Sequence, residues 1–189
     1  RGLAGHVEDK SWAVVLGERN SGKGVLTGAC EMAFSTSIVR TFNAESFLSR
    51  RADADETKML GFLLPGEWAR LIVSNEVKTD EGASLNGAIL KKMSSGGDTI
   101  CARALYQNGV EFKMQGRQMI CANDLPPVRP NDALSTCCYI QFPSTFVDAG
   151  DARVAQAHFH PKDDTIKEFC QQPSTQAAIT HLLRARARR

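Results

Sequence analysis

Eight residues near the start of the chain have the types and spacing of a phosphate-binding loop. They read G-E-R-N-S-G-K-G, and they follow the apolar run 12–16 and precede a helix-compatible stretch. In the pattern G-x-x-x-x-G-K-[ST] the glycines let the backbone wrap phosphate oxygens, the lysine reaches the β and γ phosphates, and the last hydroxyl holds Mg²⁺. The pattern predicts a nucleotide site, and its contacts would come from Gly17, Glu18, Arg19, Asn20, Ser21, Gly22, Lys23, Gly24 and Val25.

The last position of this pattern is Gly24, which has no hydroxyl. The metal would then be held by Ser21, Thr27, water or a later acid. A G-x-x-x-x-G-K string is also found in ordinary glycine turns, so the strand before it and the helix after it are needed to support the nucleotide interpretation.

A second candidate is Glu76, the acid that ends the short apolar run 69–76. In P-loop ATPases an apolar strand beside the P-loop strand ends in carboxylates that bind Mg²⁺ or position the attacking water. Glu76 is placed for both roles. The alternative is a solvated acid just past the end of a strand.

A third candidate is Asn123, which follows the apolar strand expected at 117–122. A polar side chain at that strand end is where a sensor of the γ-phosphate would lie. Asn123 also precedes Leu125-Pro126-Pro127, so an Asx-turn explains it equally well. We expect three apolar strands side by side that bring Lys23, Glu76 and Asn123 to one triphosphate.

Alternation of strand-like and helix-like stretches predicts an α/β fold with a mainly parallel sheet flanked by helices. Expected strands are 12–16, 37–42, 69–76, 117–122 and 137–142, and expected helices are 25–34, 53–64, 81–93, 165–172 and 174–186. Segment 143–161 is expected to be irregular. We divide the chain into a core, 1–150, and a C-terminal helical extension, 151–189.

Two alternating segments, 99–106 and 110–114, predict a β-hairpin before the strand that leads to Asn123. Asn108-Gly109 lies between them and is a strong hairpin signal.

Composition narrows the class of protein. The chain has 189 residues, a net charge of +2 and six cysteines without a C-x-x-C pair, which favours a single reduced domain without zinc or structural disulfides. No apolar run approaches the roughly 20 residues that span a bilayer, so we expect a soluble intracellular protein.

The arginine-rich end, 184–189, is interpreted as a solvated helix end, with nucleic-acid contact as the alternative. Because the chain begins with Arg, we expect it to be a segment of a longer one.

Together these stretches resemble the superfamily 3 helicases, and more closely the helicase module of the primase-helicases of poxviruses, giant viruses and some phages. The resemblance runs from about Trp12 to Val147. It rests on G-E-R-N-S-G-K-G, R-L-I-V-S-N-E, K-K-M-S-S-G-G-D-T-I-C-A-R-A-L-Y and Q-M-I-C-A-N-D-L-P, followed by F-P-S-T-F-V. The third motif is the most specific of them.

The resemblance implies an AAA+-like ATPase core, homo-hexameric rings of the full-length protein and ATP hydrolysis with Mg²⁺ that drives translocation on single-stranded DNA. By match of position, Lys23 would contact the β and γ phosphates, Glu76 would polarise the attacking water, and Asn123 would sense the γ-phosphate. The hairpin at Asn108 would project into the central channel, where Lys113 and Arg103 would contact DNA. It implies action in a viral factory, the host nucleus or the cytoplasm.

One departure from the family concerns catalysis. Many relatives carry an arginine pair before the last core strand, where this chain has Ser135-Thr136-Cys137-Cys138. Either Arg129 or Arg153 would supply the arginine finger from a shifted position, or another cation would serve, and we favour Arg129. The alternative function is a nucleotide- or DNA-binding module with lost or weak ATPase turnover.

Overall fold

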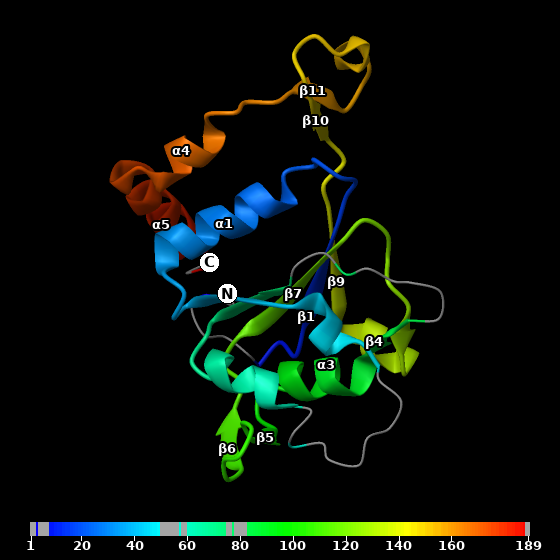
Figure 1. The fold of residues 1–189 in the computed structure, drawn as a ribbon, viewed down its shortest axis with the longest axis vertical. Helices are drawn as coiled ribbons and strands as arrows, with labels where there is room; N and C mark the ends of the chain where they lie inside the picture. Colours follow the sequence, from blue (N-terminus) through cyan, green and yellow to red (C-terminus); the bar gives the residue numbers. More distant parts are fainter. Residues whose placement is uncertain are drawn as a thin grey trace.

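A five-stranded parallel sheet forms the centre of the molecule in the computed structural model, which describes residues 3, 8–49, 57, 60–74, 77 and 83–187 (Figure 1). The strand order is β2-β3-β7-β1-β9, and every neighbouring pair is parallel. The strands are β1 (Trp12–Leu16), β2 (Val39–Phe42), β3 (Leu71–Ser74), β7 (Arg117–Ala122) and β9 (Cys137–Gln141). The predicted α/β class and the predicted parallel sheet are confirmed.

Register places the carboxyl ends of the three central strands at one edge of the sheet. Leu16 at the end of β1 pairs with Ala122 at the end of β7, and Ser74 at the end of β3 pairs with Ile120 of β7. Strands β3, β7 and β1 therefore lie side by side as expected. Strand β7 lies between β3 and β1.

Helices cover both faces of the sheet. Because successive side chains of a strand point to opposite faces, Val14 and Val15 of β1 belong to different hydrophobic clusters. The cluster of Val15 includes Cys30 of α1 (Lys23–Phe34), and Leu183 of α5 (Pro173–Ala187) packs against it. The cluster of Val14 includes Leu90 of α3 (Gly87–Ser94). Helix α4 (Ile166–Gln171) joins α5 against α1 (Figure 1).

Shorter elements surround this core. The described part of the chain also forms three two-stranded sheets: β5 (Thr99–Ala102) with β6 (Val110–Lys113), β4 (Leu85–Asn86) with β8 (Val128–Arg129), and β10 (Thr145–Val147) with β11 (Phe159–Pro161). The 3₁₀ helices are η2 (Ala44–Phe47), η3 (Leu60–Gly66), η4 (Asn131–Thr136) and η5 (Ala152–Ala155). In Figure 1 the β5–β6 hairpin and the β10–β11 pair project from opposite ends of the molecule.

Two predicted helices differ from the structure. Within 53–64, Thr57 is α-helical as predicted, residues 60–64 belong instead to η3, a 3₁₀ helix that contains Pro65, and the other residues lie outside the described part of the chain. The helix predicted from residue 81 begins only at Gly87, because the Asn86 side chain accepts a hydrogen bond from the backbone N–H of Ile89 (3.1 Å) and caps the helix. Residues 83–86 precede the helix, and 81–82 lie outside the described residues.

Two predicted loops also need correction. Segment 143–161 is not irregular, because β10 and β11 pair within it in parallel. The hairpin turn is not at Asn108-Gly109: Ala102 pairs with Val110, and the backbone N–H of Gln107 donates to the carbonyl of Ala104 (3.2 Å), which places the turn at Leu105-Tyr106. The division at residue 150 remains a prediction.

Burial of the cysteines is only partly as predicted. All six are free, and Cys30, Cys121 and Cys170 are buried, whereas Cys138 is exposed on β9. Within the described residues no helix is long and apolar enough to cross a membrane.

Candidate active site

The loop from Gly17 to Gly22 joins β1 to the start of α1, which begins at Lys23 (Figure 1). Gly22 occupies the N-cap position with a left-handed φ of 91° and offers no side chain to the helix. The first N–H groups of a helix have no acceptor within the helix, and the helix dipole adds positive potential there. The start of α1 therefore has the geometry of an anion-binding site.

Gly17 sits where a larger residue would not fit. A Cβ built on Gly17 would lie 2.7 Å from the carbonyl oxygen of Phe142 and 2.7 Å from Oγ of Ser21. Its backbone N–H also donates to the carbonyl of Ala122 at the end of β7 (3.3 Å). The loop is thus pressed against the carboxyl ends of neighbouring strands, and this close approach requires glycine.

The Lys23 ammonium lies across the loop. Its Nζ donates to the carbonyl of Gly17, to the carbonyl of Glu18 (3.0 Å) and to Oδ1 of Asn123 (3.2 Å), and it is 3.4 Å from Oγ of Ser21. These acceptors are all oxygens, so the ammonium occupies the position from which it can exchange loop carbonyls for phosphate oxygens. Two of the three residues expected at one triphosphate, Lys23 and Asn123, are in direct contact although they are 100 positions apart.

Glu76 lies outside the described residues, so its predicted catalytic and metal roles stay predictions. Its described neighbours lie beside β7 near the carboxyl end of that strand. Ser74 pairs with Ile120, and the backbone N–H of Val77 donates to the carbonyl of Cys121 (3.0 Å).

The hydroxyls considered for the metal differ in their surroundings. Ser21 is buried, and its Oγ faces the Lys23 ammonium. Thr27 turns its hydroxyl to the carbonyl of Gly24 (3.2 Å) in the first turns of α1. Gly24 itself has nothing within 4 Å of a built Cβ, so packing does not demand glycine there. Of the two hydroxyls, that of Ser21 is the better placed to reach a loop-bound nucleotide.

Segment β10 lies against the outer side of the loop. The backbone N–H of Phe146 donates to the carbonyl of Asn20 (2.9 Å), and a Cβ built on Gly22 would be 3.5 Å from the Phe146 ring. A cavity of about 470 Å³ opens beside the loop and is lined in part by Glu18, Asn123 and His158. Sequence reasoning missed Phe146 as part of this site, because its place depends on the pairing of β10 with β11.

The residues predicted to contact DNA all belong to the hairpin, at the far end of the molecule from the loop (Figure 1). Lys113 pairs with Thr99 at the base of the hairpin and is exposed, while Asn108 lies on the returning arm. The backbone N–H of Arg103 donates to the carbonyl of Thr57 (2.9 Å). The tip instead carries Tyr106, which is 96% exposed and has a positive φ of 61°. Sequence reasoning missed this residue as a DNA contact, although an aromatic at the end of the first alternating segment was a signal for it.

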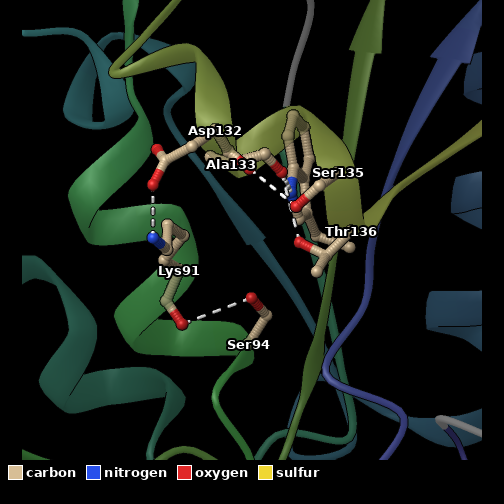
Figure 2. Close-up of polar contacts among 7 residues, drawn as sticks. Lys91, Ser94, Asp132, Ala133, Ser135 and Thr136 are labelled. Carbon is tan, nitrogen blue, oxygen red and sulfur yellow. Dashed lines mark hydrogen bonds and ion pairs between the residues drawn. The ribbon is translucent and has the colours of Figure 1, made fainter.

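Ser135 and Thr136 occupy the place where the resemblance to superfamily 3 helicases led us to expect an arginine pair (Figure 2). Ser135 donates to the carbonyl of Asp132 (2.7 Å), and Thr136 donates to the carbonyl of Ala133 (3.2 Å), so both hold the η4 turn. The only cation drawn beside them is Lys91 of α3, which pairs with Asp132 (2.6 Å) and lowers the pKa of that carboxyl through its hydrogen bond.

The two alternative arginines occupy different parts of the molecule. Arg129 lies on β8, paired with Asn86 just before α3. Arg153 lies on η5, next to β11. It is close enough to the loop for the charge of Glu18 to contribute, after Asp151, to raising the pKa of its guanidinium.

Comparison with known proteins gives a relative and a fold. No family model matches the chain. It is 28% identical over 148 residues to a Sputnik virophage protein named "Putative helicase V13". The chain has a helicase-like relative. The match covers 77% of this chain but only 19% of that protein, so the chain spans about a fifth of its relative's length.

Solved structures share the fold. The apo C-terminal region of NrS-1 superposes with a TM-score of 0.58 and 13% identity over 93% of this chain and 37% of that one. Another structure of the same region, residues 305–718, gives a TM-score of 0.56 and 12% identity, over 94% of this chain and 39% of that one. At this identity the likeness is one of fold alone.

Proposed function

We propose that the chain is the ATP-hydrolysing core of a nucleic-acid helicase of superfamily 3 type. It would use ATP and Mg²⁺ to translocate on single-stranded DNA during replication of a virus or mobile element. In this proposal the full-length protein is a homo-hexamer that works inside a cell, in a viral factory, the nucleus or the cytoplasm.

The observation that carries the proposal is the contact between Lys23 Nζ and Asn123 Oδ1 (3.2 Å) at the carboxyl edge of a parallel sheet. Ligands of open α/β sheets bind at that edge. The start of α1 and the Lys23 ammonium supply positive potential there, and Asn123 supplies a neutral polar group one hydrogen bond away.

Phosphoryl transfer to water needs little covalent chemistry from a protein, so placement and charge do most of the work. Lys23 would neutralise the β and γ oxygens as charge develops. Asn123 would read the γ-phosphate, and Glu76 would orient the attacking water and hold Mg²⁺ with help from Ser21. The backbone of residues 17–25 would enclose the phosphates.

Contact with DNA is proposed for the β5–β6 hairpin. Lys113 and Arg103 would attract phosphates, Asn108 would add a polar contact, and Tyr106 would offer a ring on which a base can stack. Basic side chains combined with exposed aromatics are the usual means of holding single strands without sequence preference.

Arg129 is proposed as the arginine finger that enters the site of a neighbouring copy. Its strand β8 pairs with β4 and packs with α3 on the face of the sheet opposite α1. Arg129 would then act in the ATP site of another chain, where an arginine finger raises the rate of hydrolysis by about 10³- to 10⁵-fold.

ATP hydrolysis by the chain, with and without single-stranded DNA, tests the proposal. We expect a DNA-stimulated rate that is lost in Lys23→Ala through failure to bind ATP, and lost in Glu76→Gln with ATP binding retained. Equal background rates in all three proteins would exclude a motor.

A second candidate is a nucleotide- or DNA-binding module with weak turnover, favoured by the absence of a hydroxyl at Gly24. It predicts that wild-type protein and Glu76→Gln both bind ATP and hydrolyse it equally slowly. Because a Cβ at position 24 meets nothing within 4 Å, Gly24→Ser is the matched variant: a gain in rate would show that the missing hydroxyl limits turnover.

A further inference from the structure

A second cavity lies on the outer side of the phosphate loop, between that loop and residues 145–162. Its volume is about 200 Å³, and it is lined by Asn20 from the loop and by Phe146, Asp151, Arg153 and Lys162 from the other side. The lining holds two cations, Arg153 and Lys162, and each is paired with a lining carboxylate, Asp151 and Asp148 respectively. The cavity therefore brings two ion-paired cations next to the loop, and it is a candidate extension of the phosphate site.

The segment that carries these cations is fastened to its own chain's loop. Phe146 makes the backbone hydrogen bond to Asn20 and packs its ring near Gly22. Pairing of β10 with β11 then fixes Phe159 opposite Thr145, and the ring of His160 lies 5.9 Å from that of Phe146. Residues between the two strands, including Arg153, are therefore held beside the loop of the same chain.

Arg153 is held by a partner that it can exchange. Its guanidinium donates to the carboxylate of Asp151 through Nη2 (2.6 Å) and Nε (3.0 Å), and it lies 5.4 Å from the centre of the Phe159 ring. The side chain is 54% exposed. Ion pairs this exposed to solvent are weak, so a more highly charged acceptor can displace Asp151.

The loop already influences this guanidinium. The pKa of Arg153 is raised first by its hydrogen bond to Asp151 and then by the charges of Asp151 and, less strongly, Glu18 of the loop. The pKa of Asp151 is lowered to about 2 by the hydrogen bond from Arg153, so the pair stays charged throughout the range in which proteins work.

We propose that Arg153 is a second cation of the phosphate site and acts on the loop of its own chain. When a triphosphate binds, the guanidinium exchanges the Asp151 carboxylate for phosphate oxygens, with the Phe159 ring beneath it. The Lys23 ammonium carries one positive charge, whereas a triphosphate carries several negative ones, and a guanidinium fits two phosphate oxygens at once. This inference rests on the proposed nucleotide site but assigns Arg153 a different role from the finger proposed for Arg129.

The test is the dissociation constant of a fluorescent ATP analogue with Mg²⁺, measured at protein concentrations below and above any self-association. Arg153→Ala should weaken binding roughly tenfold at both concentrations, since loss of a charge-assisted hydrogen bond has about this effect. Lys167→Ala removes an exposed positive charge from α4 and should leave the affinity unchanged.

Asp151→Asn tests whether nucleotide binding depends on the Arg153 guanidinium itself or on its ion pair with Asp151. This variant frees Arg153 without removing it, so binding should equal or exceed that of the wild type. Loss of affinity in Asp151→Asn equal to that in Arg153→Ala would overturn the inference, because the ion pair rather than the guanidinium would then matter. So would unchanged affinity in Arg153→Ala, or weakening only above the association threshold, which would put Arg153 in a neighbouring chain's site.

The same titration distinguishes failure of this inference from failure of the proposed function. If wild-type protein does not bind the analogue more tightly than Lys23→Ala, the nucleotide site itself is wrong. If wild type binds and Arg153→Ala binds equally well, only the role of Arg153 is wrong.

Discussion

Gly17 and Gly24 belong to the same eight-residue loop, yet their surroundings differ sharply. A Cβ at Gly17 would press on a backbone carbonyl and on Ser21, whereas one at Gly24 would meet open space at the start of a helix. The sequence motif alone does not distinguish the two positions. In the structure, packing requires glycine at position 17 but not at position 24.

Gly17→Ala should therefore lower the free energy of unfolding by about 1–3 kcal/mol, the usual cost of overpacking. Gly24→Ala should keep or raise it by up to about 1 kcal/mol, because alanine is favoured over glycine in a helix. Urea unfolding of the two variants measures both effects. Equal changes in stability would contradict the contrast between the two positions.

Cys137 and Cys138 are adjacent in sequence but differ in exposure: Cys137 is half-buried and Cys138 is exposed. Burial, and to a smaller extent the neighbouring Cys138, raises the pKa of the Cys137 thiol to about 11. The reactive thiolate therefore forms only as the pH approaches 11, and at pH 8 about a thousandth of Cys137 is ionised. Iodoacetamide at pH 8 should label the exposed Cys138 first, and mass spectrometry of the peptide 137–141 reports the order. Faster labelling of Cys137 would contradict its burial.

At the scale of elements, sequence patterns predicted what depends on local apolar spacing. Strands β1, β3, β7 and β9 are apolar runs bounded by polar residues or glycines, and helix α1 follows from its glycine-bounded start. The contact of Lys23 with Asn123 was also predictable, because parallel strands deliver their carboxyl ends to one edge.

Elements that depend on distant partners were not predictable. Strand β10 has three residues and forms only against β11, which begins 14 positions further along, so neither strand has a periodic signal of its own. The places of Phe146 and Arg153 beside the loop depend on that pairing. The Asn108-Gly109 signal was overridden by the cross-strand register, in which Thr99 faces Lys113 and Ala102 faces Val110.

The hairpin tip carries a testable consequence. Tyr106→Ala should weaken binding of single-stranded DNA about tenfold, because a stacked base contributes about 1–3 kcal/mol, and it should leave ATP binding intact. Leu105→Ala is the matched control, since Leu105 is also exposed at the tip (68%) but has no ring. Fluorescence anisotropy with a labelled oligonucleotide provides the measurement. Equal losses in the two variants would argue against stacking.

Considered as a whole molecule, the chain separates its two proposed sites. The nucleotide loop lies at the carboxyl edge of the sheet, next to β10, and the hairpin leaves the opposite end, where β6 leads into β7 (Figure 1). Strand β7 runs between them and ends at Asn123, the residue that contacts Lys23. Strand β7 therefore connects the hairpin to the proposed γ-phosphate position, which gives a direct route between the two proposed sites.

The rate of ATP hydrolysis with saturating single-stranded DNA, compared between Asn123→Ala and Asp124→Ala, tests this account most directly. Both substitutions shorten an exposed polar side chain beyond β7, but only Asn123 contacts Lys23. We predict that Asn123→Ala loses at least tenfold of the DNA-stimulated rate while Asp124→Ala keeps it. Equal rates in the two variants, or a wild-type rate no higher than that of Lys23→Ala, would contradict it.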